Sequence, residues 1–304
     1  MERQKQILQK HVDTLLNLPN VVGVGIGHKI KDGETLNEHA IVALVTKKVS
    51  KFYLNEASTI PAELDEIRTD VVEVGEVSLL ENTGKMRPAQ PGISIGHYKI
   101  TAGTFGAVVY DKNTKEPLII SNNHVLANVT NGKDGNSAIG DPIYQPGPYD
   151  GGTAQDTIAH LHRFVPITYY KTLPLSPVKN KVDTAVAKPI SKDLINPEIL
   201  EIGKVNGTIE AAVGMAVKKN GRTTGFTRGT IQTLHTTIKV NMGNNRIAVF
   251  EDQIVTGPIS AGGDSGSLVL NENNQAVGLL FAGSTETTIL CPIANVLSAL
   301  NVTL

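Results

Sequence analysis

The chain has 304 residues, 40% of them hydrophobic, and a formal net charge of −1. This length allows one large domain or two to three small ones, with enough core to fold without disulfides. There is no basic excess to bind nucleic acid or an anionic membrane, and 4% aromatic residues with no Trp disfavour base stacking. We therefore expect neither nucleic acid nor membrane among the partners.

The N-terminal twenty residues mix both charge signs and lack the continuous apolar stretch of a signal peptide. No run of about eighteen apolar residues occurs anywhere in the chain. The single cysteine, Cys291, permits no intramolecular disulfide and follows an apolar run, which indicates a buried thiol. Together these features predict a cytoplasmic protein.

Residues 1–82 are predicted to form a small α+β unit. Apolar side chains at helical spacing predict an amphipathic helix over residues 5–17, and residues 60–67 suggest a helical turn. The β-branched runs predict three strands, at residues 21–30, 39–49 and 69–77. Residues 83–92 combine Gly, Pro and charge without periodicity, which indicates a linker.

Residues 93–304 have a different pattern. Short β-branched runs recur between clusters of Gly, Asn, Asp and Pro, as in a β-barrel or a β-sandwich. The segment CPIANVLSALN near the end has Pro at its start and apolar residues at helical spacing, which predicts a closing helix. The fold class is therefore mainly β, preceded by the α+β unit.

The segment SAGGDSGSLVL contains Ser265 between Asp264 and Gly266, just before an apolar strand. Gly262, Gly263 and Gly266 would let the chain form a tight turn that exposes a nucleophilic serine and directs backbone N–H groups to one point. A glycine-rich hairpin without catalytic function would show the same pattern. The segment alone leaves both interpretations open.

A nucleophilic serine needs a base and an acid upstream or downstream. His124 ends an apolar strand in PLIISNNHV, and Asp183 precedes another in NKVDTAVAKP. Each alone could be a loop residue in solvent, although a lone carboxylate there would be buried only if paired. The order His, Asp, Ser is that of the chymotrypsin-type triad. Asp156 and Asp193 are the rival acids, in less suitable segments.

Other motifs carry weaker signals. GVGIG at residues 23–27 lacks the spacing of a dinucleotide-binding loop. His160 and His162 share one face of a strand but have no third metal ligand nearby, so a structural role is favoured. Asp141 and Asp150 lie in a long loop with too few oxygen ligands for Ca²⁺. We expect no metal and no organic cofactor.

These motifs together resemble the trypsin-like serine peptidases of chymotrypsin fold. GGDSGS is similar to their nucleophile motif, SNNHV and DTAVA to the histidine and acid motifs of high-temperature-requirement enzymes, and KKNGRTTGFTRGTI to a segment of streptogrisin-like enzymes. Over essentially its whole length the chain resembles bacterial trypsin-like proteins related to the plant narrow-leaf protease, through VVGVGIG, TDVVEVG, RPAQPGISIGH, QPGPYDGG and GLLFAG. The resemblance implies a chymotrypsin-like double β-barrel over residues 93–304.

The resemblance also implies catalytic roles. Ser265 would be the nucleophile, His124 the general base and acid, and Asp183 the residue that orients the histidine. The backbone N–H groups of Gly263 and Ser265 would form the oxyanion hole. The implied function is that of a serine endopeptidase acting on peptide or protein substrates through an acyl-enzyme. A weakly catalytic peptide-binding or scaffolding protein, or an esterase, remain the alternatives.

The same resemblance assigns the substrate contacts. Phe281, Ala282 and Gly283 would line the cleft and pair with the substrate backbone. Ile259, six residues before the serine, would form the base of a neutral primary pocket. In trypsin, the aspartate at the position of Asp264 pairs with a newly freed N-terminal amine. In this chain we expect Asp264 to be paired with internal hydrogen-bond donors instead. The N-terminal unit would then stay attached to the enzyme as a docking or regulatory part. One such role is a contact between copies of the chain in a homo-oligomer.

Overall fold

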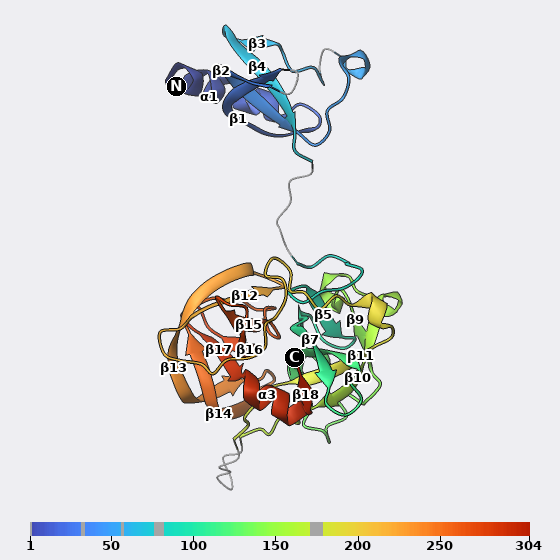
Figure 1. Ribbon diagram of the computed structural model, residues 1–304. Helices are drawn as coiled ribbons and strands as arrows, with labels where there is room; N and C mark the ends of the chain where they lie inside the picture. The colour runs from blue at the N-terminus through green and yellow to red at the C-terminus, as the bar shows by residue number, and fades with distance from the viewer. Residues whose placement is uncertain (1, 32–33, 56–57, 76–81, 171–178) are drawn as a thin grey trace. The chain divides into compact units, whose positions relative to one another are not determined.

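The computed structural model describes residues 2–31, 34–55, 58–75, 82–170 and 179–304 (Figure 1). The contacts divide the chain into two compact units, one ending at residue 79 and the other beginning at residue 80. Each unit has apolar clusters of its own.

The first unit packs one helix against a four-stranded sheet. Its elements are α1 (Glu2–Leu16), β1 (Val21–Lys31), β2 (Glu34–Val45), β3 (Glu63–Leu64) and β4 (Ile67–Glu73), with strand order β1-β2-β4-β3. The helix buries Ile7 and Leu15 in a cluster with Ile41 of β2 and Leu64 of β3. This is the apolar helix face that the spacing predicted, and the α+β class of the unit is confirmed.

The helical turn predicted at residues 60–67 is wrong, because this segment contains β3 and the start of β4. Leu64 and Ile67 are partners in an antiparallel pair, with Asp65 and Glu66 between them. Both connecting residues have left-handed backbone, with φ of 45° and 67°. Two such residues form the tight turn that suits a β-hairpin.

The first barrel of the second unit is a curled eight-stranded sheet, with strand order β18-β7-β8-β11-β10-β9-β5-β6 (Figure 1). Its strands are β5 (Ser94–His97), β6 (Gly103–Thr104), β7 (Ala107–Asp111), β8 (Pro117–Ser121), β9 (Pro142–Tyr144), β10 (Thr157–Phe164), β11 (Ala185–Pro189) and β18 (Val302–Thr303). The short helix α2 (Asn123–Leu126) follows β8.

The second barrel is closed, with strand order β12-β13-β14-β17-β16-β15. Its strands are β12 (Ala216–Gly221), β13 (Gly225–Asn241), β14 (Ile247–Thr256), β15 (Leu268–Asn271), β16 (Ala276–Gly283) and β17 (Thr288–Pro292). The predicted closing helix is α3 (Ile293–Leu300), after which β18 pairs with β7 of the first barrel. The mainly β, two-barrel fold class is confirmed.

One apolar cluster joins the two barrels. It contains Val109 and Ile120 of the first barrel and Leu268 and Leu279 of the second, all at most 1% exposed. Full burial of one such side chain contributes about 1.5–3 kcal/mol. The barrels are therefore held together by a continuous core, which fixes residues of one barrel relative to the other.

Residues 83–92, expected to form a linker, instead pack as part of the second unit. Ala89 is fully buried, and its N–H donates to the carbonyl of Leu194 at 2.7 Å. The N–H of Gly92 donates to the carbonyl of Phe105 at 2.8 Å. Composition suggested a linker because an irregular segment packed on a barrel can have the same Gly and Pro content as a free one.

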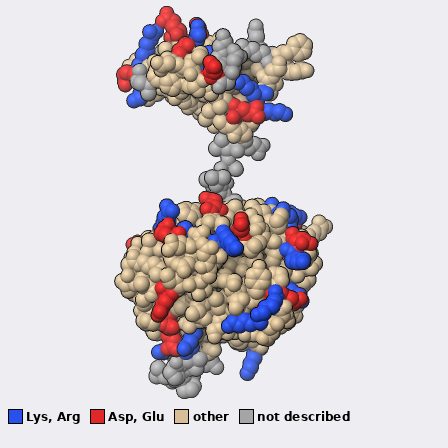
Figure 2. All heavy atoms as spheres, in the orientation of Figure 1, with Lys and Arg blue, Asp and Glu red and all other residues tan. Residues whose placement is uncertain are grey.

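Among the described residues, no helix combines the length and apolar character needed to cross a membrane. On the face shown in Figure 2, Lys and Arg side chains lie among Asp and Glu side chains on each unit. This mixture agrees with the small net charge of the sequence.

Candidate active site

His124 and Asp183 come together at the ends of two paired strands. Ser121 of β8 and Ala185 of β11 are register partners, so the residues just beyond them are neighbours. The Nδ1 atom of His124 lies 2.7 Å from Oδ2 of Asp183. The backbone N–H of His124 donates to Oδ1 of the same carboxylate at 3.3 Å. Asp183 therefore contacts both the ring and the backbone of the histidine.

The Asp183 carboxylate is 0% exposed, whereas the His124 side chain is 23% exposed. Asn122 donates from Nδ2 to the Asp183 carbonyl at 2.8 Å, and the Asp183 N–H donates to Sγ of Cys291 at 3.3 Å. Burial raises the pKa of Cys291 well above its ordinary value, so this residue stays a thiol. Cys291 is buried, as predicted, and its sulfur also holds the backbone of Asp183.

Ser265 lies on a tight turn just before β15. Gly266 has a φ of 96°, and a Cβ atom at that position would come 2.0 Å from Oγ of Ser121, so only glycine fits. The Ser265 carbonyl accepts from the N–H of Thr104 in the first barrel at 2.7 Å. The Ser265 hydroxyl donates to the carbonyl of Phe281 at 3.4 Å, which is a long and weak hydrogen bond.

Asp264, beside the serine, is satisfied by internal donors as predicted. It is fully buried and lies 3.3 Å from Nζ of Lys219, which is also 0% exposed. Its carboxylate accepts from the N–H groups of Thr223, at 2.8 Å, and Ala261, at 2.9 Å, and from Oγ1 of Thr224 at 2.6 Å. Burial opposes ionisation, but the Lys219 charge and these donors hold the pKa of Asp264 below its ordinary value.

A cleft of about 840 Å³ adjoins His124. Phe281, Ala282 and Gly283 at the end of β16 line it, as the sequence assignment requires. Its walls also contain apolar side chains from both barrels, including Ile100, Val129, Ile238, Val240, Met242 and Ile289. This volume is within the range of small-ligand and peptide sites.

Ile259 does not line this cleft. Its side chain is 3% exposed and packs inside the second barrel with Val217 and Leu280. Spacing along the chain gave its position but not the direction of its side chain. The neighbouring Ser260 was missed: its Oγ lies 2.7 Å from Oγ1 of Thr288, and a Cβ atom at Gly283 would lie 3.2 Å from it.

The rival acids have other partners. Asp156 closes a capping box with Thr153 and lies 2.6 Å from Nζ of Lys85. The bond to Lys85 and those to Thr153 lower the pKa of Asp156 to about 2. Asp193 lies in a short 3₁₀ turn and accepts at 3.4 Å from the hydroxyl of Ser191. Both aspartates therefore serve local turns.

The residues considered for metal binding either form ion pairs with other side chains or lie apart from further ligands. Asp141 lies 3.0 Å from Nε2 of the buried His97, and Asp150 forms an ion pair with Arg222. His160 is exposed on β10, one residue before a register shift in the ladder with β11. Within the described ranges, no group of three or more His, Cys, Asp or Glu side chains is placed to hold a metal.

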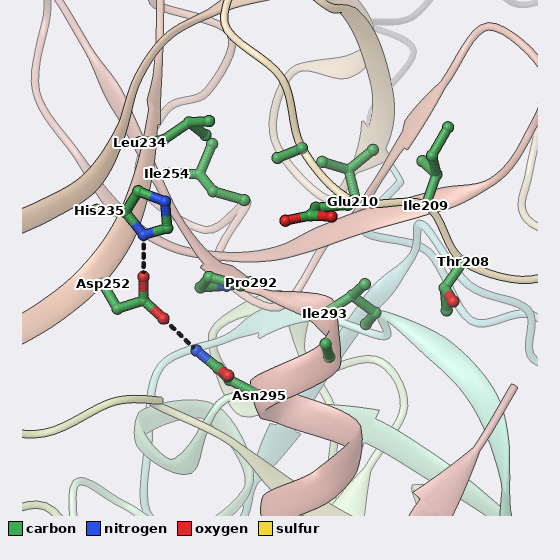
Figure 3. A pocket seen from close by; sticks show the side chains of 13 residues that line it. Thr208, Ile209, Glu210, Leu234, His235, Asp252, Ile254, Pro292, Ile293 and Asn295 are labelled. Atoms are coloured by element: carbon green, nitrogen blue, oxygen red, sulfur yellow. Dashed lines mark hydrogen bonds and ion pairs between the residues drawn. The ribbon is translucent and has the colours of Figure 1, made fainter.

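A separate pocket of about 350 Å³ lies beside α3 (Figure 3). His235 of β13 and Asp252 of β14 form a further His–Asp pair there, 2.6 Å apart, and Asn295 donates to the same carboxylate at 2.9 Å (Figure 3). The side chain of His235 is 82% exposed and that of Asp252 is 38% exposed. Ser265 is not among the residues that line this pocket or the cleft beside His124.

Comparison with known proteins gives one curated relative. No protein-family model matches the chain. Protein NARROW LEAF 1 of Oryza sativa subsp. japonica is 23% identical over 302 residues, which cover 87% of this chain and 51% of the relative. The chain therefore spans about half the length of the curated relative that it matches.

Solved structures resemble the chain in fold. The Nocardiopsis protease is 18% identical with a TM-score of 0.50, covering 71% of this chain and 98% of that protein. A glutamic-acid-specific serine protease is 20% identical with a TM-score of 0.50, covering 71% of this chain and all of the other. These likenesses and the strand order identify the fold as the chymotrypsin-like double β-barrel of serine proteases.

Proposed function

We propose that the chain is a serine endopeptidase that works through an acyl-enzyme. His124 takes the proton from the Ser265 hydroxyl as its oxygen attacks the peptide carbonyl, and the N–H groups of Gly263 and Ser265 bind the resulting oxyanion. The C–N bond then breaks, and the amine leaves with that proton. Water, activated by His124, next cleaves the ester and restores the serine. Every step uses groups of this chain, so the mechanism calls for no cofactor.

The observation that carries this proposal is the 2.7 Å contact between His124 and a completely buried carboxylate, Asp183. A carboxylate at Nδ1 keeps the proton on that nitrogen, so Nε2 is free to act as a base. It also stabilises the imidazolium that forms when His124 accepts the serine proton. Burial strengthens both effects because less water screens the charges.

The cleft supports a proposal for the substrate class. Among the described residues that line it, the side chains with full charges are Lys99 and Lys239, and the others are polar or apolar. Ser260 and Thr288 are neutral and hydrogen-bonded to each other near Gly283. We therefore expect substrates with small or medium neutral residues at the primary site and apolar or acidic residues nearby. A peptide library with a dominant Arg or Lys preference would contradict this.

Lys219 bears on activation. It supplies the cation beside Asp264, so the proposed enzyme needs no N-terminus freed by cleavage. Intact mass spectrometry of freshly purified, active protein should show the uncut chain. Activity confined to a species trimmed near residue 90 would contradict this part of the proposal.

One observation favours the alternative of a weakly catalytic peptide-binding protein. The Ser265 hydroxyl donates to Phe281, and that bond must break before the hydroxyl can donate to His124. At 3.4 Å the bond is weak enough to be exchanged at little cost. A fluorophosphonate probe separates the two functions, because only an activated serine reacts with it.

The decisive test compares the wild-type protein with Ser265→Ala. We expect the wild type to react with the probe at Ser265 and to hydrolyse casein or peptides, and the variant to do neither while keeping its circular dichroism spectrum. Unchanged hydrolysis by the folded variant would refute the assignment. A wild-type protein that binds peptides but neither reacts nor hydrolyses would establish the binding function instead.

A further inference from the structure

The peptide unit between Gly262 and Gly263 provides one of the two oxyanion donors, if the proposed function holds. A trans peptide unit is planar, and its C=O and N–H bonds point in opposite directions. Whatever holds the Gly262 carbonyl therefore also sets the direction of the Gly263 N–H. Gly263 has a φ of 100°, and two consecutive glycines restrict the rotation of this peptide unit very little.

The Gly262 carbonyl is held by Thr223, whose Oγ1 donates to it at 2.8 Å. The same Oγ1 accepts a hydrogen bond from Nη1 of Arg222 at 2.9 Å. Because Arg222 can only donate, it occupies a lone pair of the Thr223 hydroxyl and leaves the hydroxyl proton for the carbonyl. The direction of the Gly263 N–H thus depends on Arg222 through one hydroxyl.

Arg222 is itself fixed by the first barrel. Its Nε donates to Oδ2 of Asp150 at 2.6 Å and its Nη2 to Oδ1, in the bidentate arrangement that suits a guanidinium. The two side chains are 11% and 6% exposed. Asp150 also accepts from the hydroxyl of Ser94 in β5. The carboxylate that positions Arg222 is therefore anchored outside the barrel that carries the serine.

Space around Gly263 shows how closely this arrangement fits. A Cβ atom there would lie 2.4 Å from Oγ1 of Thr223 and 2.6 Å from Nη1 of Arg222. Thr104 of the first barrel adds a parallel support, since its Oγ1 accepts from the Arg222 N–H and donates to the Gly263 carbonyl, both at 3.0 Å. The guanidinium and the two hydroxyls thus enclose the peptide.

The other oxyanion donor is controlled separately. The Ser265 N–H belongs to the peptide unit whose carbonyl is that of Asp264. This carbonyl accepts from Oγ of Ser267 at 2.6 Å and from its N–H at 3.1 Å. A change at Arg222 should therefore affect one donor and leave the other in place.

We propose that Arg222, held by Asp150, is a positioning residue that orients the Gly263 N–H toward the oxyanion by way of Thr223. The tests are Arg222→Met and Thr223→Val, with Thr223→Ser to restore the hydroxyl. Arg228→Met is the matched control, because this arginine is 63% exposed on β13 and its Nε lies 3.6 Å from Glu272. Thr223→Val leaves the Arg222–Asp150 pair intact, so it tests the proposal even where Arg222→Met folds poorly.

The measurements are kcat and KM on a chromogenic peptide amide, the inhibition constant of a peptide aldehyde, and Tm. The aldehyde adds to Ser265 as a hemiacetal whose oxygen occupies the oxyanion position. Full loss of one oxyanion donor lowers kcat about 10²–10³-fold, so we expect a decrease of at least about 10-fold. KM should change less than about twofold, and aldehyde binding should weaken by the same factor as kcat.

Thr223→Ser should recover most of the loss, and Arg228→Met should behave as wild type. A lower kcat with unchanged aldehyde affinity, or a higher KM with unchanged kcat, would overturn the positioning role. Equal effects of Thr223→Val and Thr223→Ser would do the same, because the hydroxyl would not be the cause. A wild-type protein that neither hydrolyses the amide nor binds the aldehyde would refute the proposed function, and this inference with it.

Discussion

The first barrel contains two histidine–aspartate pairs that are buried in opposite senses. In the pair His124–Asp183 the carboxylate is 0% exposed and the imidazole 23% exposed. In the pair His97–Asp141 the imidazole is 0% exposed and the carboxylate 19% exposed. The N–O distances are similar, 2.7 Å and 3.0 Å. Distance alone therefore does not distinguish a candidate catalytic pair from a structural one.

The ring nitrogens explain the difference. Nε2 of His97 contacts Asp141, and its Nδ1 accepts from the N–H of Lys99 at 3.2 Å, so both nitrogens are occupied within the fold. His124 uses Nδ1 for its aspartate, which leaves Nε2 for proton transfer. A general base needs a nitrogen that is not already engaged within the fold, and of these two histidines His124 meets that requirement.

The largest expected effect concerns the acid of the candidate catalytic pair. Asp183→Asn should lower kcat about 10⁴-fold, as the equivalent change does in trypsin, because the amide favours the wrong histidine tautomer. The fold should persist, since Asn has nearly the same shape. Peptide hydrolysis and circular dichroism, measured together, test this prediction.

Asp141→Asn is the matched control for that change. It alters a carboxylate of the same barrel whose histidine has no nitrogen to spare, so kcat should stay within about twofold of wild type in the folded protein. Loss of activity in Asp141→Asn with normal activity in Asp183→Asn would reverse the assignment of the two pairs.

The second effect is on stability. Asp141→Ala removes the partner of a buried imidazole N–H and also the acceptor of the Ala138 N–H at 2.8 Å. An unsatisfied buried donor costs about 1–3 kcal/mol, so the free energy of unfolding should fall by that amount. Urea denaturation measures it. A variant as stable as wild type would show that water replaces the carboxylate at His97.

How much the sequence could predict depended on how local each signal was. Ser265, His124 and Asp183 each lie in a short motif next to a strand, and the motifs were enough to predict the contact between His124 and Asp183 that the fold forms. The direction of the Ile259 side chain could not be read in this way. It depends on the register of the turn after β14, where the barrel interior accepts the side chain.

Partners that are distant in sequence were invisible for a different reason. Arg222 and Asp150 are 72 residues apart, and neither belongs to a periodic pattern. Lys219 stands beside another lysine, which suggests an exposed position, yet it is fully buried because Asp264 compensates its charge. Arg222 meets Asp150 across the two barrels, whereas Lys219 and Asp264 meet within the second, so both contacts depend on how the strands fold together.

A smaller effect should appear in the pH dependence of stability. Burial holds the pKa of His97 below its ordinary value of 6.5, although Asp141 acts in the opposite direction and Lys99 in the same one. The unfolded chain then binds the proton more tightly, so stability falls as pH decreases from about 6.5 through the folded-state pKa. Titration of one group changes the free energy of unfolding by at most about 1.4 kcal/mol per pH unit.

His97→Gln removes this titration. The free energy of unfolding between pH 7.5 and 5 should depend less steeply on pH in the variant than in wild type. Identical slopes in the two proteins would show that His97 has the same pKa in the folded and unfolded states. Burial of its imidazole would then have no effect on the pH dependence of stability.

The smallest effect is expected at the exposed pair His235–Asp252 in Figure 3. This pair tests whether a His–Asp contact without a buried carboxylate matters for activity. Hydrogen bonds from Asn295 and His235 hold the pKa of Asp252 below its ordinary value, so any stability that it adds is present above pH 3.8 and lost at lower pH. With 82% and 38% of the two side chains exposed, solvent screens most of that contribution. Asp252→Asn also keeps a residue type that tolerates the local φ of 64°. We therefore expect kcat within about twofold of wild type and a change in unfolding free energy below about 0.5 kcal/mol. A large loss of activity would show that a His–Asp pair can contribute to catalysis without a buried acid or a neighbouring serine. Burial of the carboxylate would then no longer distinguish a catalytic pair from a structural one.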